Sequence, residues 1–214
     1  MKQAMYVLAT VVALGAMASS AHGENWDRFR GPNGAGESEA QGIPIEWTED
    51  DYLWQRTLPG VGHSSPVVWG ERLFVTSADP QTAEQIVLAF DVRSGEPLWE
   101  RRFASHKHAM HADNSFATST PAVDADQLFV LWLDGDKVTL AALTHDGTEI
   151  WKRQIASLDE KHGFGTSPVV IGDVVCVANE TDDARYSTVM GLDRARGETR
   201  WTVPRGTGKT AYPT

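Results

Sequence analysis

Residues 89–99 read Ala-Phe-Asp-Val-Arg-Ser-Gly-Glu-Pro-Leu-Trp, a stretch in which a glycine precedes a tryptophan by four residues. The same Gly-x-x-x-Trp spacing recurs at Gly147 and Trp151 and again at Gly197 and Trp201. Successive tryptophans of the three copies are 52 and 50 residues apart. Self-similarity at such a period is typical of proteins built from repeated structural units, so the sequence predicts three copies of one unit.

Each unit begins with a Ser-Pro or Thr-Pro pair, at residues 65–66, 120–121 and 167–168. Short runs rich in Val, Leu and Phe follow each pair, and turn residues such as Asp146-Gly147 separate the runs. This pattern is typical of antiparallel strands joined by tight turns. Four short strands in every unit indicate a propeller blade. The predicted fold is therefore all-β: a β-propeller of four-stranded antiparallel blades.

The predicted domain boundaries follow from the repeat. An N-terminal extended segment covers residues 24–46, and a partial propeller covers residues 47–214. Its closing strand, at about residues 52–58, contains Trp54 and resembles the tryptophan strand that ends each unit. The blades span about residues 63–103, 116–155 and 164–205. Propellers typically need four to eight blades, so we expect an incomplete gene product or fragment that needs further blades or an oligomer to close the ring.

The first 23 residues have the order of a secretory signal peptide: Lys2, then an apolar run from Ala4 to Ala18, then small residues up to Gly23. The run is shorter than the roughly 20 residues that a membrane span needs. We therefore expect export to the periplasm or the exterior, with no membrane span after removal of the signal peptide.

Composition excludes several classes of protein. The 214 residues carry 19 Lys and Arg against 29 Asp and Glu, a net charge of −10, and no basic run offsets it. Nucleic acid is therefore not an expected partner, since binding to phosphates needs Lys and Arg. The single cysteine, Cys176, excludes an intramolecular disulfide and a cysteine-rich metal site.

The motif from Ala89 to Trp99 resembles the tryptophan-docking motif of pyrrolo-quinoline quinone (PQQ)-like propeller repeats. The third copy matches it with Gly191 in place of alanine, whereas the second carries Leu143 where the motif has aspartate. Residues 25–34 are also similar to the start of secreted repeat proteins of planctomycete-like bacteria. The resemblance covers residues 25–214 and implies that each tryptophan packs between neighbouring blades. The docking residues that it implies are Ala89, Asp91, Gly95, Trp99, Gly147, Trp151, Asp193, Gly197 and Trp201.

Histidines are concentrated in the connection between the first two units. His106, His108 and His111 lie within six residues, and imidazole is a common ligand of zinc, copper and nickel. Their spacing matches no established metal motif, and the alternative is a polar loop at one rim of the propeller. Rim loops of repeat scaffolds commonly carry binding function. The sequence thus predicts no catalytic residue and leaves a metal site open, with His106, His108 and His111 as its candidates. The predicted binding rim consists of His63, His108, His111, Asn114 and His162.

Two functions remain open. The PQQ-like repeat occurs in non-enzymatic scaffolds such as the outer-membrane protein assembly factor B family and in PQQ-dependent dehydrogenases of alcohols or sugars. The dehydrogenases combine the quinone with calcium, and many carry a ring of adjacent cysteines that the single Cys176 cannot form. We therefore expect a secreted, non-enzymatic propeller scaffold that binds a protein or glycan partner through its rim loops, with no cofactor. A PQQ-dependent dehydrogenase with calcium, or a truncated remnant of one, is the alternative.

Overall fold

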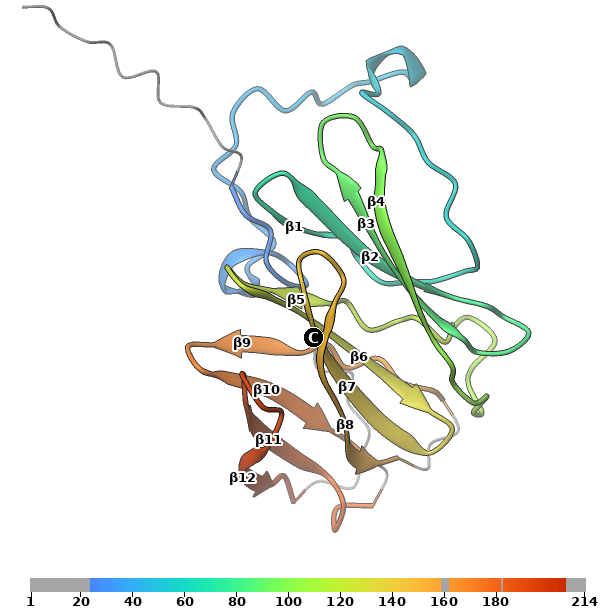
Figure 1. Ribbon diagram of the computed structural model, residues 1–214, viewed down its shortest axis with the longest axis vertical. Helices are drawn as coiled ribbons and strands as arrows, with labels where there is room; N and C mark the ends of the chain where they lie inside the picture. The colour runs from blue at the N-terminus through green and yellow to red at the C-terminus, as the bar shows by residue number, and fades with distance from the viewer. Residues whose placement is uncertain (1–23, 159–161, 182, 207–214) are drawn as a thin grey trace, which may run out of the picture.

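The computed structural model describes residues 24–158, 162–181 and 183–206, and in these the chain forms three four-stranded antiparallel sheets (Figure 1). Each sheet is a simple meander in which strands adjacent in sequence are paired. The predicted all-β propeller with four-stranded blades is confirmed. The first blade contains β1 (Val67–Trp69), β2 (Arg72–Ala78), β3 (Gln85–Asp91) and β4 (Pro97–Phe103); the second contains β5 (Ala122–Val123), β6 (Gln127–Asp134), β7 (Lys137–Thr144) and β8 (Glu149–Ser157); the third contains β9 (Val169–Ile171), β10 (Val174–Asn179), β11 (Thr188–Asp193) and β12 (Thr199–Pro204).

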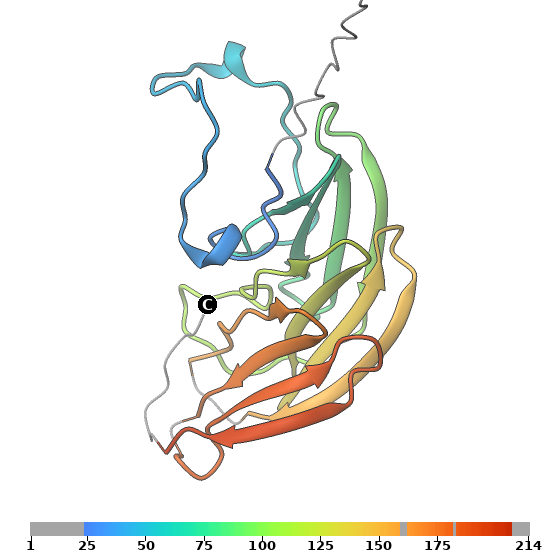
Figure 2. The same cartoon turned by 90° about the vertical axis from the view of Figure 1, so that its left-hand side faces the viewer.

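The middle strands of the first two blades are buried on both faces along most of their length. This is why β2, β3, β6 and β7 are nearly continuous apolar runs rather than alternating ones. Figure 2 shows the three sheets fanned side by side, with neighbouring blades packed face to face. One apolar core around Phe74 and Leu128 joins the first two blades, and another around Phe129 and Leu192 joins the second and third. The three sheets do not close into a ring within the described residues.

The indoles of Trp54, Trp99 and Trp151 each reach across to the next blade, whereas Trp201, also expected to dock, is 40% exposed. The N–H of each of these three indoles donates to a backbone carbonyl in the turn between the third and fourth strands of the next blade, so the one polar atom of a large apolar ring is satisfied. The three bonds run from Trp54 to the Val92 carbonyl (2.8 Å), from Trp99 to the His145 carbonyl (2.9 Å) and from Trp151 to the Arg194 carbonyl (3.0 Å).

A glycine lies under each of these indoles. A Cβ atom added at Gly197 would lie 2.5 Å from Cε3 of Trp151, and the φ of Gly197 is +70°, a conformation that other residues rarely adopt. Gly95 and Gly147 are placed in the same way under Trp54 and Trp99. The repeated glycine is thus required for two reasons: the turn needs a positive φ, and the indole above it leaves no room for a side chain.

The turn of the second blade corrects one alignment made from the sequence. Gly95 N–H and Gly197 N–H donate to the carbonyls of Asp91 and Asp193, four residues earlier, whereas Gly147 N–H donates to the carbonyl of Thr144, three residues earlier. The second turn is one residue shorter, so Thr144 occupies the place of the motif aspartate. Leu143, which the sequence aligned there, is instead fully buried in the core.

Residues 52–58, expected to form a closing strand, form no strand in the structure. Within the described residues these positions have no neighbouring strand that could pair with them. Trp54 nevertheless docks on the first blade, where its ring stacks on Phe90 with the centroids 6.4 Å apart. Leu58 packs against the apolar outer face of the same blade. Side-chain docking therefore covers this flank without a backbone ladder.

The N-terminal strap, residues 25–36, runs along the inner strands. Trp26 forms an antiparallel bridge with Val68 of β1, and Asp27 O accepts a hydrogen bond of 2.8 Å from Val123 N–H of β5. The strap turns back through the short 3₁₀ helix η1 (Pro32–Gly34); a second such helix, η2 (Glu49–Asp51), follows the strap. The strap therefore joins the inner edges of two blades, on the side seen in Figure 2.

The sequence led us to expect a signal peptide and no membrane span after its removal. No helix in the described part of the chain is long and apolar enough to cross a bilayer. The signal peptide expected at residues 1–23 lies outside the described residues.

Candidate functional site

The histidine-rich connection from β4 to β5, residues 104–121, is held against the connection from β8 to β9. Asn114 fixes the contact: its side-chain amide donates to the His162 carbonyl at 3.0 Å, and its Oδ1 accepts from Ser115 N–H at 2.8 Å. His111 N–H also donates to the His162 carbonyl, at 3.2 Å. The structure thus brings together three of the predicted rim residues, His111, Asn114 and His162, from two successive blade connections.

Gly163 makes this contact possible. Its φ is +90°, and a Cβ atom added there would lie 2.6 Å from Nδ2 of Asn114 and 2.8 Å from Cβ of Met110. Any side chain at this position would push the two connections apart. The sequence analysis did not single out Gly163, because a lone glycine beside a histidine carries no pattern by itself.

The clustered histidines have separate environments. His106 Nδ1 lies 2.7 Å from Oδ1 of Asp134, and His111 Nδ1 lies 3.4 Å from a carboxylate oxygen of Asp113. His108 packs edge-on against Phe116, with ring centroids 5.0 Å apart. Within residues 24–158, 162–181 and 183–206, no three His, Cys, Asp or Glu side chains form a group that could hold a metal ion. The geometry therefore gives no support to a metal site at His106, His108 and His111.

His108 is more buried than the other histidines of the predicted rim. Burial lowers the pKa of its imidazole below the usual range. Both ring nitrogens are covered from solvent. His108 is thus a packed ring, whereas His63, His111 and His162 are exposed and form the accessible part of the predicted rim.

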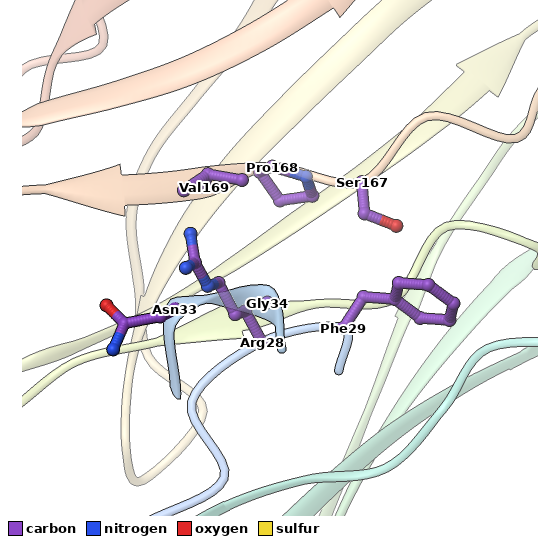
Figure 3. Close-up of a pocket in the computed structure, with 7 residues that line it drawn as sticks. All are labelled: Arg28, Phe29, Asn33, Gly34, Ser167, Pro168 and Val169. Atoms are coloured by element: carbon purple, nitrogen blue, oxygen red, sulfur yellow. The ribbon is translucent and has the colours of Figure 1, made fainter. Parts of the chain in front are cut away.

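A pocket of about 170 Å³ lies between the N-terminal strap and the start of β9 (Figure 3). The sequence analysis missed it because the pocket joins residues more than 130 positions apart. From the strap side, the Arg28 side chain extends toward Pro168 and Val169. Its lining residues are Arg28, Phe29, Asn33, Gly34, Ser167, Pro168 and Val169.

The Ser167 side of the pocket belongs to a repeated hydrogen-bond series between blades. The residue before the proline of each unit donates its N–H to the hydroxyl at the same position of the next blade. Ser65 N–H donates to Thr120 Oγ1 at 2.9 Å, and Thr120 N–H donates to Ser167 Oγ at 3.1 Å. The Ser-Pro and Thr-Pro pairs that mark the repeat therefore also fix the spacing of the inner strands.

Comparison with known proteins identifies the repeat. A family model described as "Outer membrane protein assembly factor BamB" matches residues 43–157 and 83–212. No curated protein sequence matches the chain.

Solved structures resemble the chain at low sequence identity. A europium-containing methanol dehydrogenase is 22% identical, with a TM-score of 0.50, over 67% of this chain and 25% of its own. BamB from Moraxella catarrhalis is 16% identical, with a TM-score of 0.47, over 68% of this chain and 41% of its own. The chain thus spans less than half the length of either protein, and at these identities the likeness concerns the fold alone. Since the family model matches most of its length, the chain belongs to the outer membrane protein assembly factor BamB family of PQQ-like β-propeller repeat proteins.

Proposed function

We propose that this protein is an exported, non-enzymatic scaffold that binds a protein partner through its histidine-rich rim. The observation that carries this proposal is the joining of two blade connections at Asn114 and the His162 carbonyl, beside the exposed side chains of His111 and His162. A polar surface fixed by the scaffold can bind a partner without a large ordering cost. Loops on one face of a repeat scaffold commonly have this role.

The family description supports a protein as the partner and the cell envelope or exterior as the location. It names an assembly factor of the outer membrane rather than an enzyme. The residue types of the rim are also compatible with a glycan, because imidazole and amide groups donate and accept hydrogen bonds. A glycan is therefore the competing outcome of the test.

Site-specific photo-crosslinking tests the rim. A photoreactive amino acid replaces His111 in the full chain, and the matched control carries it at Arg196, which is exposed in the turn between β11 and β12 at the opposite end of the blades. After irradiation in the exporting cell, we expect a discrete protein adduct from position 111 and none from position 196. Equal labelling at both positions, or no adduct at position 111, contradicts the proposal. A glycan on the adduct in place of a protein corrects the partner class.

The dehydrogenase alternative requires a quinone and calcium close to the inner strands. Calcium takes six to eight oxygen ligands, and the described residues contain no clustered acidic group of three or more. The inner strands β1 and β5 are also hydrogen-bonded to the strap. These features support a scaffold without the cofactor.

Titration with PQQ and calcium tests this alternative. We expect no saturable change in tryptophan fluorescence and no dye reduction with alcohols or sugars. Stoichiometric binding with turnover above that of a heat-denatured sample would favour the dehydrogenase instead.

A further inference from the structure

Arg28 occupies a fixed position in the pocket between the strap and the third blade. Asp27, the residue before it, is bonded to β5, and Gly31 N–H donates to the Arg28 carbonyl at 2.9 Å, so the backbone is held on both sides. The side chain is held as well, because its Nε–H donates to the Gly31 carbonyl at 3.3 Å. The strap therefore presents the terminal amino groups of the guanidinium to the pocket (Figure 3).

The packing of the strap supports this orientation. Gly31 lies directly against the Trp26 ring, where an added Cβ would be 2.5 Å from Cε3, so the turn cannot shift toward the blades. A Cβ atom at Gly34 would lie 3.7 Å from Nη2 of Arg28. Gly31 thus fits only because it has no side chain beneath Trp26, and Gly34 lies in van der Waals range of the guanidinium.

The charge of Arg28 has no counterion among the described residues. Arg28 is half-buried, and no carboxylate of the described chain lies within ion-pair distance of its guanidinium. Arg194, another half-buried arginine, contrasts with it: Arg194 is paired with Asp124 at 2.6 Å and with Asp126 at 2.5 Å. A partly desolvated cation without a partner favours an anion in the space beside it.

Size and charge restrict the anion. A volume of about 170 Å³ is below the roughly 300–1,000 Å³ of ordinary ligand pockets, so the space suits a small molecule. A guanidinium matches the planar geometry of a carboxylate, to which it can donate two parallel hydrogen bonds. Elsewhere the chain is strongly acidic, with a net charge of −10, which disfavours a doubly charged anion.

We propose that the pocket is a binding site for a small monocarboxylate. Arg28 pairs with its carboxylate group, while Ser167, whose hydroxyl points away from the guanidinium in Figure 3, lines the far side of the pocket. Pro168 and Val169 supply an apolar wall for a short carbon chain. None of the residues that line the pocket belongs to the predicted rim.

Ligand-detected NMR on the full chain tests the site, with acetate as the probe at constant ionic strength. We expect saturable saturation transfer to the acetate methyl group. Arg28→Gln removes the charged donor and should weaken acetate binding by at least about tenfold, which is the loss expected for a charge-assisted hydrogen bond. Arg30→Gln is the matched control: Arg30 is an exposed arginine of the same strap, lying over the Phe29 ring, and its loss should leave binding unchanged.

Two further probes separate the chemistries. Acetamide, a neutral molecule of the same shape, should not bind, and inorganic phosphate should displace acetate only at higher concentrations. Arg28→Lys keeps the charge but loses the planar pair of donors, so it should bind acetate more weakly than wild type; this variant decides the question if Arg28→Gln does not fold. Unchanged acetate binding in either Arg28 variant, equal binding of acetamide, or tighter binding of phosphate overturns the proposal.

Discussion

The docking of Trp151 on the third blade allows a quantitative prediction for Trp151→Ala. This side chain is 5% exposed and contacts Phe129, with the ring centroids 6.1 Å apart, and it covers Gly197. Truncating a buried tryptophan leaves a cavity and costs about 3–5 kcal/mol of unfolding free energy. Of this, the bond from the indole N–H to the Arg194 carbonyl accounts for about 0.5–1.5 kcal/mol.

Urea unfolding followed by circular dichroism measures the loss, with Trp201→Ala as the matched control. Trp201 ends the same motif one blade later but is 40% exposed, so its truncation should cost less than about half as much. Trp151→Phe keeps an aromatic ring and removes the N–H, and it should fall between wild type and Trp151→Ala. A loss below about 1 kcal/mol for Trp151→Ala, or equal losses for both alanine variants, would refute the role of the docked indole.

Three further outcomes follow from the same structure. Gly197→Ala should destabilise the protein clearly more than Gly172→Ala in thermal melts, because both glycines have positive φ but only the Cβ at position 197 would meet the docked indole; equal losses would contradict this. The pKa values of Asp91 and Asp193 are lowered from 3.8, by the Ser94 backbone N–H and by Arg200 respectively, so their stabilisation is present above about pH 4 and is lost as the pH falls through the lower folded values. In the double variant Asp91→Asn, Asp193→Asn, the melting temperature should therefore fall less steeply below pH 4 than in wild type. Parallel plots of melting temperature against pH, measured from pH 7 to pH 2, would contradict this. The outer face of the third blade exposes apolar side chains such as Val203, so the purified chain should self-associate. In light scattering, Val203→Lys should shift the protein toward the monomer, and a monomeric wild type would contradict association through this face.

The repeat could be predicted from the sequence because each of its elements is local. The Gly-x-x-x-Trp spacing places a glycine in a turn and a tryptophan on the next strand, and both are set by a few neighbouring residues. The second blade was misaligned because the alignment counted residues back from Trp151, which placed Leu143 at the motif aspartate. The turn of this blade is one residue shorter, so the equivalent position is Thr144. Residue spacing alone does not reveal that a turn has been shortened by one residue.

The candidate site depended on contacts that spacing does not encode. Asn114 was predicted as one member of a polar surface, and the structure shows in addition that its side chain joins two blade connections. His108 lay in the predicted rim, but Phe116 covers it. The pocket at Arg28 needs Ser167, which lies more than 130 residues away in the sequence. Such contacts depend on how the blades are placed side by side, and no local pattern contains that information.

The N-terminal strap has a mechanical consequence. A pulling force applied at residue 24 reaches the strap before any blade. The strap is held to the first blade by the two bonds between Trp26 and Val68 and by the bond from Gly70 N–H to Asn25 Oδ1, and to β5 by the single bond at Asp27. Each blade is instead held by strand ladders and a docked indole. We therefore expect a force–extension recording to show an early, small release as the strap peels away, separated from the later rupture of the blades. The inner edges of two blades would become accessible in that first step, while the blades themselves are still folded.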